Sequence, residues 1–525
     1  MRNPQMRLFA PWIGLFLVWG TAVFAGGWAA DYGIHWDEDK LIQGIRWSIE
    51  HKTLLPHSFL YPSLLHMLSL GLLGIQGLSH LSIGASIPFV HTLREIAGSH
   101  TFLISARLMT VLLSSLAIFW VALAIWAWRK NPWEALLGAA LLGLSWEVNY
   151  HSRWFTVDPL MMQFGALLIL CLVQTQEVPE RRQWRIASAV VAGLAAGSKY
   201  TAGLCLLPIL TLLFLQVNDG SFWKKAGFLT GIFFIVFLLS TPGFVLNWGQ
   251  MSQDLLFQVH TYHTLGNDAY TVARGVPHLG LMLAYLGDTV FSWYTPVALF
   301  FSGVALIGAF DLIKKERGFA AVFFVFPFAY IALFSIQIVM IARNLLILIP
   351  FTAILAARGA TILTRSLWSP LRPGFITLIA TAMLGNGFWL FYSAWTIRVR
   401  EHFSHAIPLA QYIVHHPDEL FLLTQTAHRE LMGLGHPPPT NVTEDYRQPS
   451  DFTIFNTAEA RERFHGRWPA NRPHTVETWF CPFEVNLNYY PTWLGNHRFV
   501  VMKTDKALNV LNPPLFPNRD PQATP

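Results

Sequence analysis

Long apolar stretches alternate with short polar segments along most of the chain, and each is a candidate membrane-spanning helix. The first covers residues 8–30. Others follow at 102–128, 132–150, 155–174, 186–197, 201–217, 227–246, 279–310, 319–340, 345–357 and 375–396. The pattern therefore predicts an α-helical bundle that crosses a membrane about eleven times.

One further apolar stretch, residues 64–83, is rich in glycine and interrupted by polar side chains. If it lies along the membrane interface and does not cross, every later cluster of lysine and arginine falls on one side of the membrane. Such clusters favour the cytoplasmic side. We therefore expect an interfacial or re-entrant helix at 64–83, a cytoplasmic N-terminus and an extracytoplasmic C-terminal part.

The pattern changes after residue 397, where apolar runs become short and proline, histidine and asparagine increase. We expect a transmembrane domain over 1–397 and a small extracytoplasmic α/β domain over 398–525. The strands of the second domain are expected near 420–424, 475–480 and 498–503, with helices near 399–414 and 458–465. The proline-rich end, 513–525, is expected to be disordered.

Composition supports a polytopic membrane protein. Hydrophobic residues make up 53% of the chain and charged residues only 13%, with a mean hydropathy of +0.40. Soluble domains carry about a quarter charged residues. The net charge of +6 comes largely from the clusters between apolar stretches, so it does not indicate nucleic-acid binding. The three cysteines have no spacing typical of disulfides or of a metal site.

Ionisable residues gather where the predicted topology places the outer membrane surface. Asp37 and Glu38 follow the first apolar stretch directly. The others on this side are Arg107, Glu147, His151, Arg153, Asp158, Lys199, His260, His263, Asp268, Arg274 and Arg343. Charges near hydrocarbon are costly and tend to be kept for function. Simpler explanations remain open: a solvated acidic loop, arginines that reach lipid phosphates, or an Asp158–Arg153 pair.

A mixed set of acids and bases at a membrane surface suits transfer from a lipid-linked donor. A lipid phosphate that leaves needs cations to stabilise its charge, which Lys199, Arg343 and Arg107 would supply. An acceptor hydroxyl or amine needs a general base, for which Asp37 is placed. Oxygen-rich binding of Mg²⁺ or Mn²⁺ is a further chemical option for Asp37, Glu38, Asp158 and His263.

Several short motifs at these positions occur in the order of a known family. They are the Asp37–Glu38 pair, Y-P-S-L-L at 61–65, S-A-R-L with Arg107, S-R-W-F-T-V-D-P with Arg153 and Asp158, G-L-A-A-G-S-K-Y with Lys199, and A-R-N-L-L-I-L-I-P with Arg343. Through them the chain resembles the type C glycosyltransferases of membranes, in particular bacterial relatives of protein O-mannosyltransferases and of the lipid A aminoarabinose transferase (families 39 and 83). It departs at Ser63, which replaces a second proline, and at Asn344, where relatives often have an aromatic residue.

The resemblance implies an enzyme of the bacterial inner membrane, a hexosyl- or pentosyltransferase. It would transfer a sugar, with inversion, from a polyprenyl-phosphate donor to a lipid, glycan or protein acceptor outside the cytoplasm. Asp37 would be the catalytic base and Glu38 would orient the acceptor or sugar. The expected substrate-binding residues are Lys199, Arg343, Arg107, Asp158, Arg153, Tyr61 and His263, with no metal and no cofactor.

Two rival functions have different signatures. A transporter or lipid flippase would keep its charges near the bilayer midplane, on broken helices in repeated halves. The charges here gather at one surface and no internal repeat is visible. A scaffold without catalysis, binding through its outer domain, has no need of the acidic pair.

Overall fold

A computed structural model describes residues 4–28, 30–31, 35–81, 89–217, 220–267, 270–401, 406–423, 440–443, 448–456, 474–476 and 499–503. The chain divides into two compact units. The larger contains Met1–Asp31 and His35–Trp395, and the smaller is built from Thr396–Pro525.

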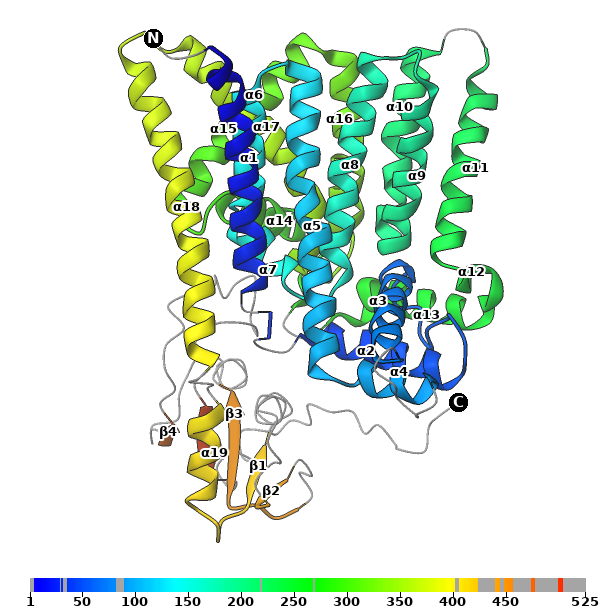
Figure 1. Ribbon diagram of the computed structural model, residues 1–525, viewed down its shortest axis with the longest axis vertical. Coiled ribbons are helices and arrows are strands. Elements are labelled where there is room, and N and C mark those ends of the chain that lie inside the picture. The colour runs from blue at the N-terminus through cyan, green and yellow to red at the C-terminus, as the bar shows by residue number, and fades with distance from the viewer. Residues whose placement is uncertain are drawn as a thin grey trace. The chain divides into compact units, whose positions relative to one another are not determined.

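Long apolar helices form the larger unit. By length and composition, eight helices among the described residues can cross a membrane. They are α1 (Pro4–Gly27), α5 (His100–Arg129), α8 (Val157–Glu177), α11 (Phe222–Ser240), α15 (Thr295–Lys315), α16 (Arg317–Ser335), α17 (Ile349–Ser366) with the 3-10 helix η4 (Ala342–Leu348) before it, and α18 (Leu371–Glu401). The shorter helices α6 (Pro132–Gly143), α9 (Arg182–Ser198) and η1–α10 (Tyr200–Gln216) stand beside them (Figure 1). The predicted multi-pass helical fold is confirmed.

Three predicted spans are each divided into two α-helices, one of them at 227–246, where α11 ends at Ser240 and α12 begins at Gly243. The other two have identifiable causes. Residues 132–150 form α6 and then α7 (Trp146–Ser152), because Ser145 caps the second helix and its hydroxyl donates to the Val290 carbonyl at 2.6 Å. Residues 279–310 form α14 (Val276–Asp288) and α15, with Pro296 in the first turn of α15. Proline lacks a backbone N–H, so it starts helices far better than it continues them. Uniform apolarity hid both breaks.

Helices α8 and α17 lie at the centre of the larger unit. In the most apolar part of α8, and of η4 together with α17, 83% of the residues are buried, against 17% in α18. Helix α8 packs against α5 and α9, and α17 against α15. Gly308 and Gly359 allow the last contact, because a Cβ on either would overlap the backbone of the facing helix.

Short helices gather at one end of the larger unit. They are α2 (Trp36–Glu50), α3 (Leu64–Leu81), α4 (Phe89–Ala97), α12 (Gly243–Leu246) and α13 (Trp248–His260), at the lower end in Figure 1. Helix α3 lies past the lower end of α9 and contacts it, and the interfacial position predicted for residues 64–83 stays a prediction.

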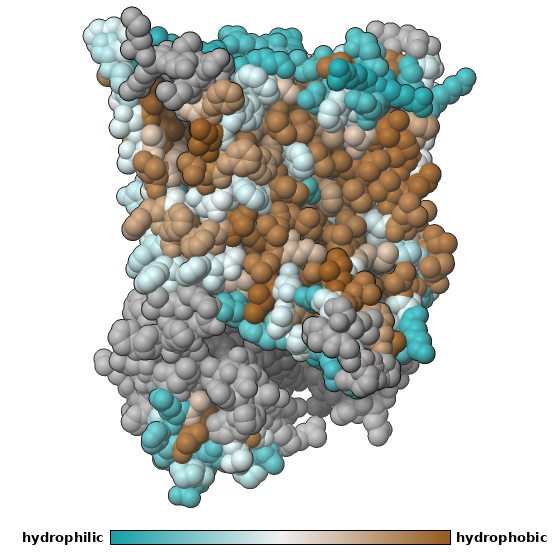
Figure 2. All heavy atoms as spheres, viewed as in Figure 1, coloured by the Kyte–Doolittle hydropathy of each residue, from teal (hydrophilic) through white to brown (hydrophobic). Residues whose placement is uncertain are grey.

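The opposite end carries basic residues. Helices α5 and α15 end there at Arg129 and Lys315, and α16 begins there at Arg317. Figure 2 shows hydrophilic side chains over this end and a broad band of apolar side chains below it. A band of this kind suits contact with lipid.

The smaller unit contains α19 (Ala406–Val414) and a five-stranded sheet of order β2-β1-β3-β5-β4. The strands are β1 (Phe421–Leu423), β2 (Val442–Thr443), β3 (Phe452–Asn456), β4 (His474–Val476) and β5 (Phe499–Lys503). Strand β1 pairs in parallel with β2 and β3, whereas β5 pairs antiparallel with β3 and β4. A small apolar core joins the helix to β1 and β3, made of Leu409, Ile413, Phe421, Leu423 and Ile454.

Three of these strands, β1, β4 and β5, lie where strands were predicted, whereas β2 and β3 were missed. The predicted helix at 399–414 is instead the end of α18 followed by α19. The predictions for 458–465 and 513–525 lie outside the described residues.

Candidate active site

The start of α2 places the two acidic residues. His35 is the N-cap, and its backbone N–H donates to Glu38 Oε2 at 3.1 Å while its ring Nδ1 accepts from the Asp37 backbone N–H at 3.2 Å. This reciprocal arrangement is a capping box, in which His35 takes the place usually held by serine or threonine. The capping box fixes the start of the helix so that the two neighbouring carboxylates face different partners, Glu38 facing Arg107 and Asp37 facing Arg343.

Glu38 is fully engaged with the protein. Arg107 holds it through two bonds, Nε to Oε1 at 2.8 Å and Nη2 to Oε2 at 2.5 Å, and the Phe155 backbone N–H donates to Oε1 at 2.8 Å. Only 1% of Glu38 is exposed. Together with the His35 backbone N–H, four donor groups surround the Glu38 carboxylate. Glu38 thereby joins α2 to α5 and to the loop before α8.

Arg107 is engaged to the same extent. Its Nη1 donates to the Ala30 carbonyl at 2.7 Å, and its guanidinium lies over the Trp154 ring at 4.9 Å. The residue is 1% exposed. These contacts give Arg107 a structural partner in Glu38, whereas the expectation that it binds a lipid phosphate stays a prediction.

Asp37, Arg343, Asp158 and Lys199 form one continuous chain of ion pairs. Arg343 Nη2 lies 2.5 Å from Asp37 Oδ2, and Arg343 Nε lies 3.2 Å from Asp158 Oδ2. Lys199 Nζ lies 2.5 Å from Asp158 Oδ1. Four separate elements meet here, because Asp37 is on α2, Asp158 starts α8, Lys199 follows α9 and Arg343 is in η4. The anion that compensates Lys199 is therefore Asp158, which pairs with neither Arg153 nor solvent.

This cluster of four residues is electrically balanced and buried. Two carboxylates face two cations, and the most exposed member, Lys199, is 8% exposed. Both oxygens of Asp158 are taken by the cations. Asp37 differs, since no hydrogen bond to its Oδ1 is found among the described residues. Of Asp37, Glu38 and Asp158, only Asp37 has an oxygen without a hydrogen bond or ion pair to another described residue, and this oxygen can receive a proton.

His35 and Tyr61 border Asp37 and Arg343. Both ring nitrogens of His35 face donors, the Asp37 N–H and Arg343 Nη1 at 3.0 Å. A neutral ring has one acceptor nitrogen and can accept from one of these donors, whereas a protonated ring has none and can accept from neither, so this setting favours the neutral form. Burial, and then the charge of Arg343, lower the pKa of His35 well below 6.5. Burial, and then the charge of Asp37, raise the pKa of Tyr61, so its hydroxyl stays protonated and can donate.

Other ionisable residues singled out from the sequence have contacts of their own. Arg153 Nη2 points to the Ala25 carbonyl on α1 at 3.4 Å. His263 is in the short helix η2 (Thr261–Leu265), and its backbone carbonyl accepts a hydrogen bond from Arg274 Nη2 at 3.1 Å. Glu147 accepts from the Tyr285 hydroxyl at 3.0 Å and lies 3.6 Å from His151. These contacts of Arg153 and His263 are with backbone groups and side chains outside the cluster.

Two residues of the site were not assigned by the sequence. His35 precedes the acidic pair, and its capping pattern, with Glu38 three residues later, was the available signal. Asn344 follows Arg343, and its side-chain oxygen accepts from Lys199 Nζ. Its signal was the departure from the aromatic residue that relatives often have.

The metal-site option has no support in the described residues, where no three histidine, cysteine, aspartate or glutamate side chains converge. The carboxylates of Asp37 and Asp158 face cations instead.

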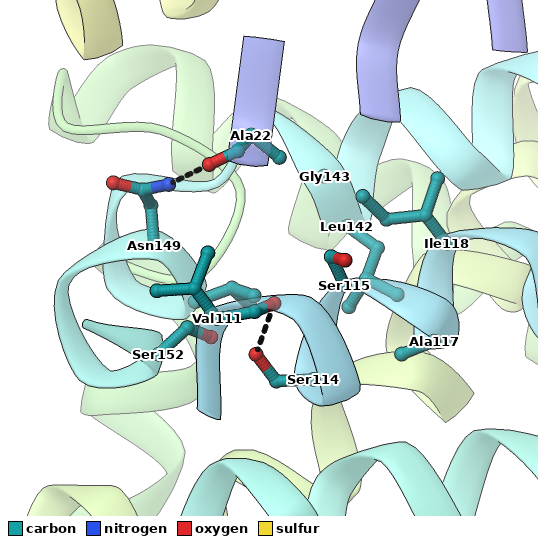
Figure 3. Close-up of a pocket in the computed structure, with 11 residues that line it drawn as sticks. Ala22, Val111, Ser114, Ser115, Ala117, Ile118, Leu142, Gly143, Asn149 and Ser152 are labelled. Atoms are coloured by element: carbon teal, nitrogen blue, oxygen red, sulfur yellow. Dashed lines mark hydrogen bonds between the residues drawn. The ribbon is translucent and has the colours of Figure 1, made fainter. Parts of the chain in front are cut away.

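A small pocket lies between α1, α5, α6 and α7, away from these charges. Its lining consists of apolar side chains, serines and Asn149, whose amide donates to the Ala22 carbonyl at 2.8 Å (Figure 3). None of the charged residues discussed above lines this pocket. We assign it no part in the chemistry of the site.

Comparison with known proteins agrees with this architecture. Residues 89–245 match the family described as dolichyl-phosphate-mannose-protein mannosyltransferase. This segment contains Arg107, Asp158 and Lys199, whereas Asp37 and Arg343 lie outside it. No curated protein sequence matches the chain.

Two solved structures have a similar fold. One is ArnT from Cupriavidus metallidurans bound to undecaprenyl phosphate, with a TM-score of 0.50 and 13% identity over 95% of this chain and 98% of that one. The other is the Archaeoglobus fulgidus oligosaccharyltransferase tethered to an acceptor peptide, with a TM-score of 0.50 and 12% identity over 87% of this chain and 70% of that one. The chain is therefore a multi-pass membrane protein with the fold of type C glycosyltransferases, and it resembles the protein O-mannosyltransferases and ArnT.

Proposed function

We propose that this protein transfers a sugar from a polyprenyl-phosphate donor to an acceptor on the extracytoplasmic side of the bacterial inner membrane. One observation carries the proposal. Asp37, a buried carboxylate with an oxygen available for a proton, shares Arg343 with the Asp158–Lys199 pair. A base and two cations are thus held together at the end of a membrane-spanning bundle. The family resemblance and the fold support the same class of reaction.

The reaction needs a base next to the acceptor and cations next to the leaving phosphate, on opposite sides of the anomeric carbon. The acceptor hydroxyl or amine attacks the anomeric carbon and its proton passes to Asp37. The bond between the anomeric carbon and the phosphate oxygen breaks, and its electrons remain on the polyprenyl phosphate. Lys199 and Arg343 stabilise that charge. Attack opposite the leaving group inverts the anomeric centre.

Charge balance suggests how the donor activates the base. The cluster of Asp37, Arg343, Asp158 and Lys199 is already neutral, so a phosphate that binds Arg343 adds a negative charge and competes with Asp37. Asp158 still holds both cations in place. Displaced from Arg343, Asp37 becomes a better proton acceptor, because an adjacent cation stabilises the carboxylate form. Donor binding and base activation are then one event.

The remaining predicted residues take supporting roles in this proposal. Glu38 and Arg107 position the start of α2, and so position Asp37. Tyr61 offers a protonated hydroxyl next to Asp37, suited to a sugar or phosphate oxygen. The contacts of Arg153 with Ala25 and of His263 with Arg274 give these two residues no defined role in this proposal.

The test is transfer by the purified protein from synthetic polyprenyl-phosphate sugars, read by mass spectrometry. The sugar and the acceptor come from comparing lipid-linked sugars and envelope glycans in cells with and without the protein. The proposal expects a lipid-linked sugar to accumulate and a glycan to lose one residue when the protein is absent. Unchanged lipids and glycans, with no transfer in vitro, would contradict it.

The proposed orientation has its own test. A reporter fused after Lys130 should be cytoplasmic, and one fused after Pro525 should be extracytoplasmic. A cytoplasmic C-terminal reporter would place the acidic pair on the wrong side for this reaction.

A further inference from the structure

Among the residues that the structure describes, the side-chain amide nitrogen of Asn344 has no hydrogen-bond partner, whereas the oxygen of the same amide binds Lys199. The residue lies in η4 and is 2% exposed. Its Oδ1 accepts from Lys199 Nζ. A lysine ammonium has only donors, so the amide oxygen must face it, and the orientation of the amide is settled. Nδ2 therefore points away from Lys199, and it has no hydrogen-bond partner within the described part of the chain.

The backbone of Asn344 is held firmly. Its N–H donates to the Ile341 carbonyl at 2.9 Å, and its carbonyl accepts from the Tyr330 hydroxyl at 2.7 Å. The side chain is tied in turn to Lys199. Nδ2 is thus a fixed donor in a buried place, where an unpaired N–H group is costly and calls for an explanation.

The surroundings of Nδ2 select an anionic acceptor. Lys199 and Arg343 are the cations nearest in the chain of contacts, and both oxygens of Asp158 are occupied by them. The amide that carries Nδ2 binds Lys199 through its oxygen and belongs to the residue after Arg343, so an acceptor at Nδ2 feels the charge of both cations, which favours an anionic oxygen such as that of a phosphate. We propose that Asn344 Nδ2 donates to a phosphate oxygen of the lipid-linked donor and that Asn344 is a substrate-binding residue. This inference rests on the proposed function.

The competing role is that Asn344 only orients Lys199. A double-mutant cycle separates the two roles. The four proteins are wild type, Asn344→Leu, Lys199→Gln and the double variant, and the probe is undecaprenyl phosphate, whose Kd is measured for each. Leucine has a similar volume, and the two backbone contacts of Asn344 survive the substitution.

We expect each single substitution to raise the Kd about tenfold, as for one hydrogen bond to a charged group. In the double variant the two losses should multiply. If Asn344→Leu raises the Kd by less than about twofold in the Lys199→Gln background, Asn344 acts only through Lys199 and the inference is wrong.

Asn386 provides the matched control. It is 3% exposed, and both ends of its amide are satisfied, by Ser292 at 2.7 Å and by the Phe291 carbonyl at 2.8 Å. Asn386→Leu should lower thermal stability and leave the Kd unchanged, whereas Asn344→Leu should raise the Kd without lowering stability. A wild-type protein that binds no undecaprenyl phosphate and transfers no sugar contradicts the proposed function itself. A wild-type protein that transfers sugar, beside an Asn344→Leu variant with the normal Kd, contradicts this inference alone.

Discussion

We expect Glu38→Ala to lower the stability of the protein strongly, and a substitution of its neighbour Asp37 to change it little. The change leaves the Arg107 guanidinium, 1% exposed, without its counter-charge. It also leaves the backbone N–H groups of His35 and Phe155 without their acceptor. Breaking a buried ion pair by removing one partner costs about 3–5 kcal/mol. We therefore expect Glu38→Ala to lower the free energy of unfolding by at least about 3–5 kcal/mol.

Asp37→Asn offers the contrast. Arg343 keeps Asp158 at 3.2 Å and the His35 ring at 3.0 Å, so no buried cation is left alone. Its stability should stay close to that of wild type. The exposed acid Asp39 is the control, and Asp39→Ala should change neither stability nor transfer.

Thermal unfolding in detergent, followed together with transfer activity, measures both effects. We expect Glu38→Ala to lose several degrees of Tm and to lose activity in proportion to folded protein. If Glu38→Ala unfolds at the wild-type temperature and still transfers no sugar, Glu38 takes part in the chemistry and our reading of its four hydrogen bonds is wrong.

Three other predictions follow from particular contacts. Lys199→Met should raise the KM for the donor by about 10- to 100-fold, the value of one charge-assisted contact, while Lys199→Arg keeps part of the affinity; an unchanged KM would remove Lys199 from the donor site. Because the pKa of His35 is lowered on folding, the unfolded chain takes up a proton below about pH 6.5 that the folded protein does not, so stability should fall as the pH drops, and less so in His35→Gln. Equal pH dependence of Tm in both proteins would contradict this. Gly308→Leu should abolish folded yield because its side chain meets the backbone of Leu355, whereas Gly303→Leu, with open space around its Cβ, should be tolerated in a fluorescence size-exclusion profile.

Apolar periodicity and charge placement predicted the helical bundle well, because membrane spans carry strong and simple signals. The breaks at Ser145 and Pro296 were missed, since a helix end inside an apolar stretch depends on local capping and on a distant carbonyl such as that of Val290. Hydropathy does not report either.

The candidate site was predicted in composition but not in pairing. Asp37, Asp158, Lys199 and Arg343 were all chosen from the sequence, and the structure joins them in one chain of contacts. Arg107 was chosen as a phosphate ligand, yet it faces Glu38, because residues 69 positions apart in sequence meet only once the helices pack. The unpaired Nδ2 of Asn344 could not be predicted for the same reason. It follows from the contacts of Asn344 with Lys199 and Tyr330, which form only in the folded protein.

The role of Asp37 as the base is the central claim, and transfer from a synthetic polyprenyl-phosphate sugar by purified Asp37→Asn and Asp158→Asn tests it most directly. Asparagine keeps the size of the side chain and removes its basicity. We expect Asp37→Asn to fold normally, to bind undecaprenyl phosphate at least as well as wild type, and to lose about 10²- to 10⁴-fold in rate. Asp158→Asn should instead weaken folding or donor binding, because Lys199 and Arg343 lose their shared anion. A near-normal rate for Asp37→Asn beside a folded, donor-binding but inactive Asp158→Asn would move the base to Asp158 and contradict the account.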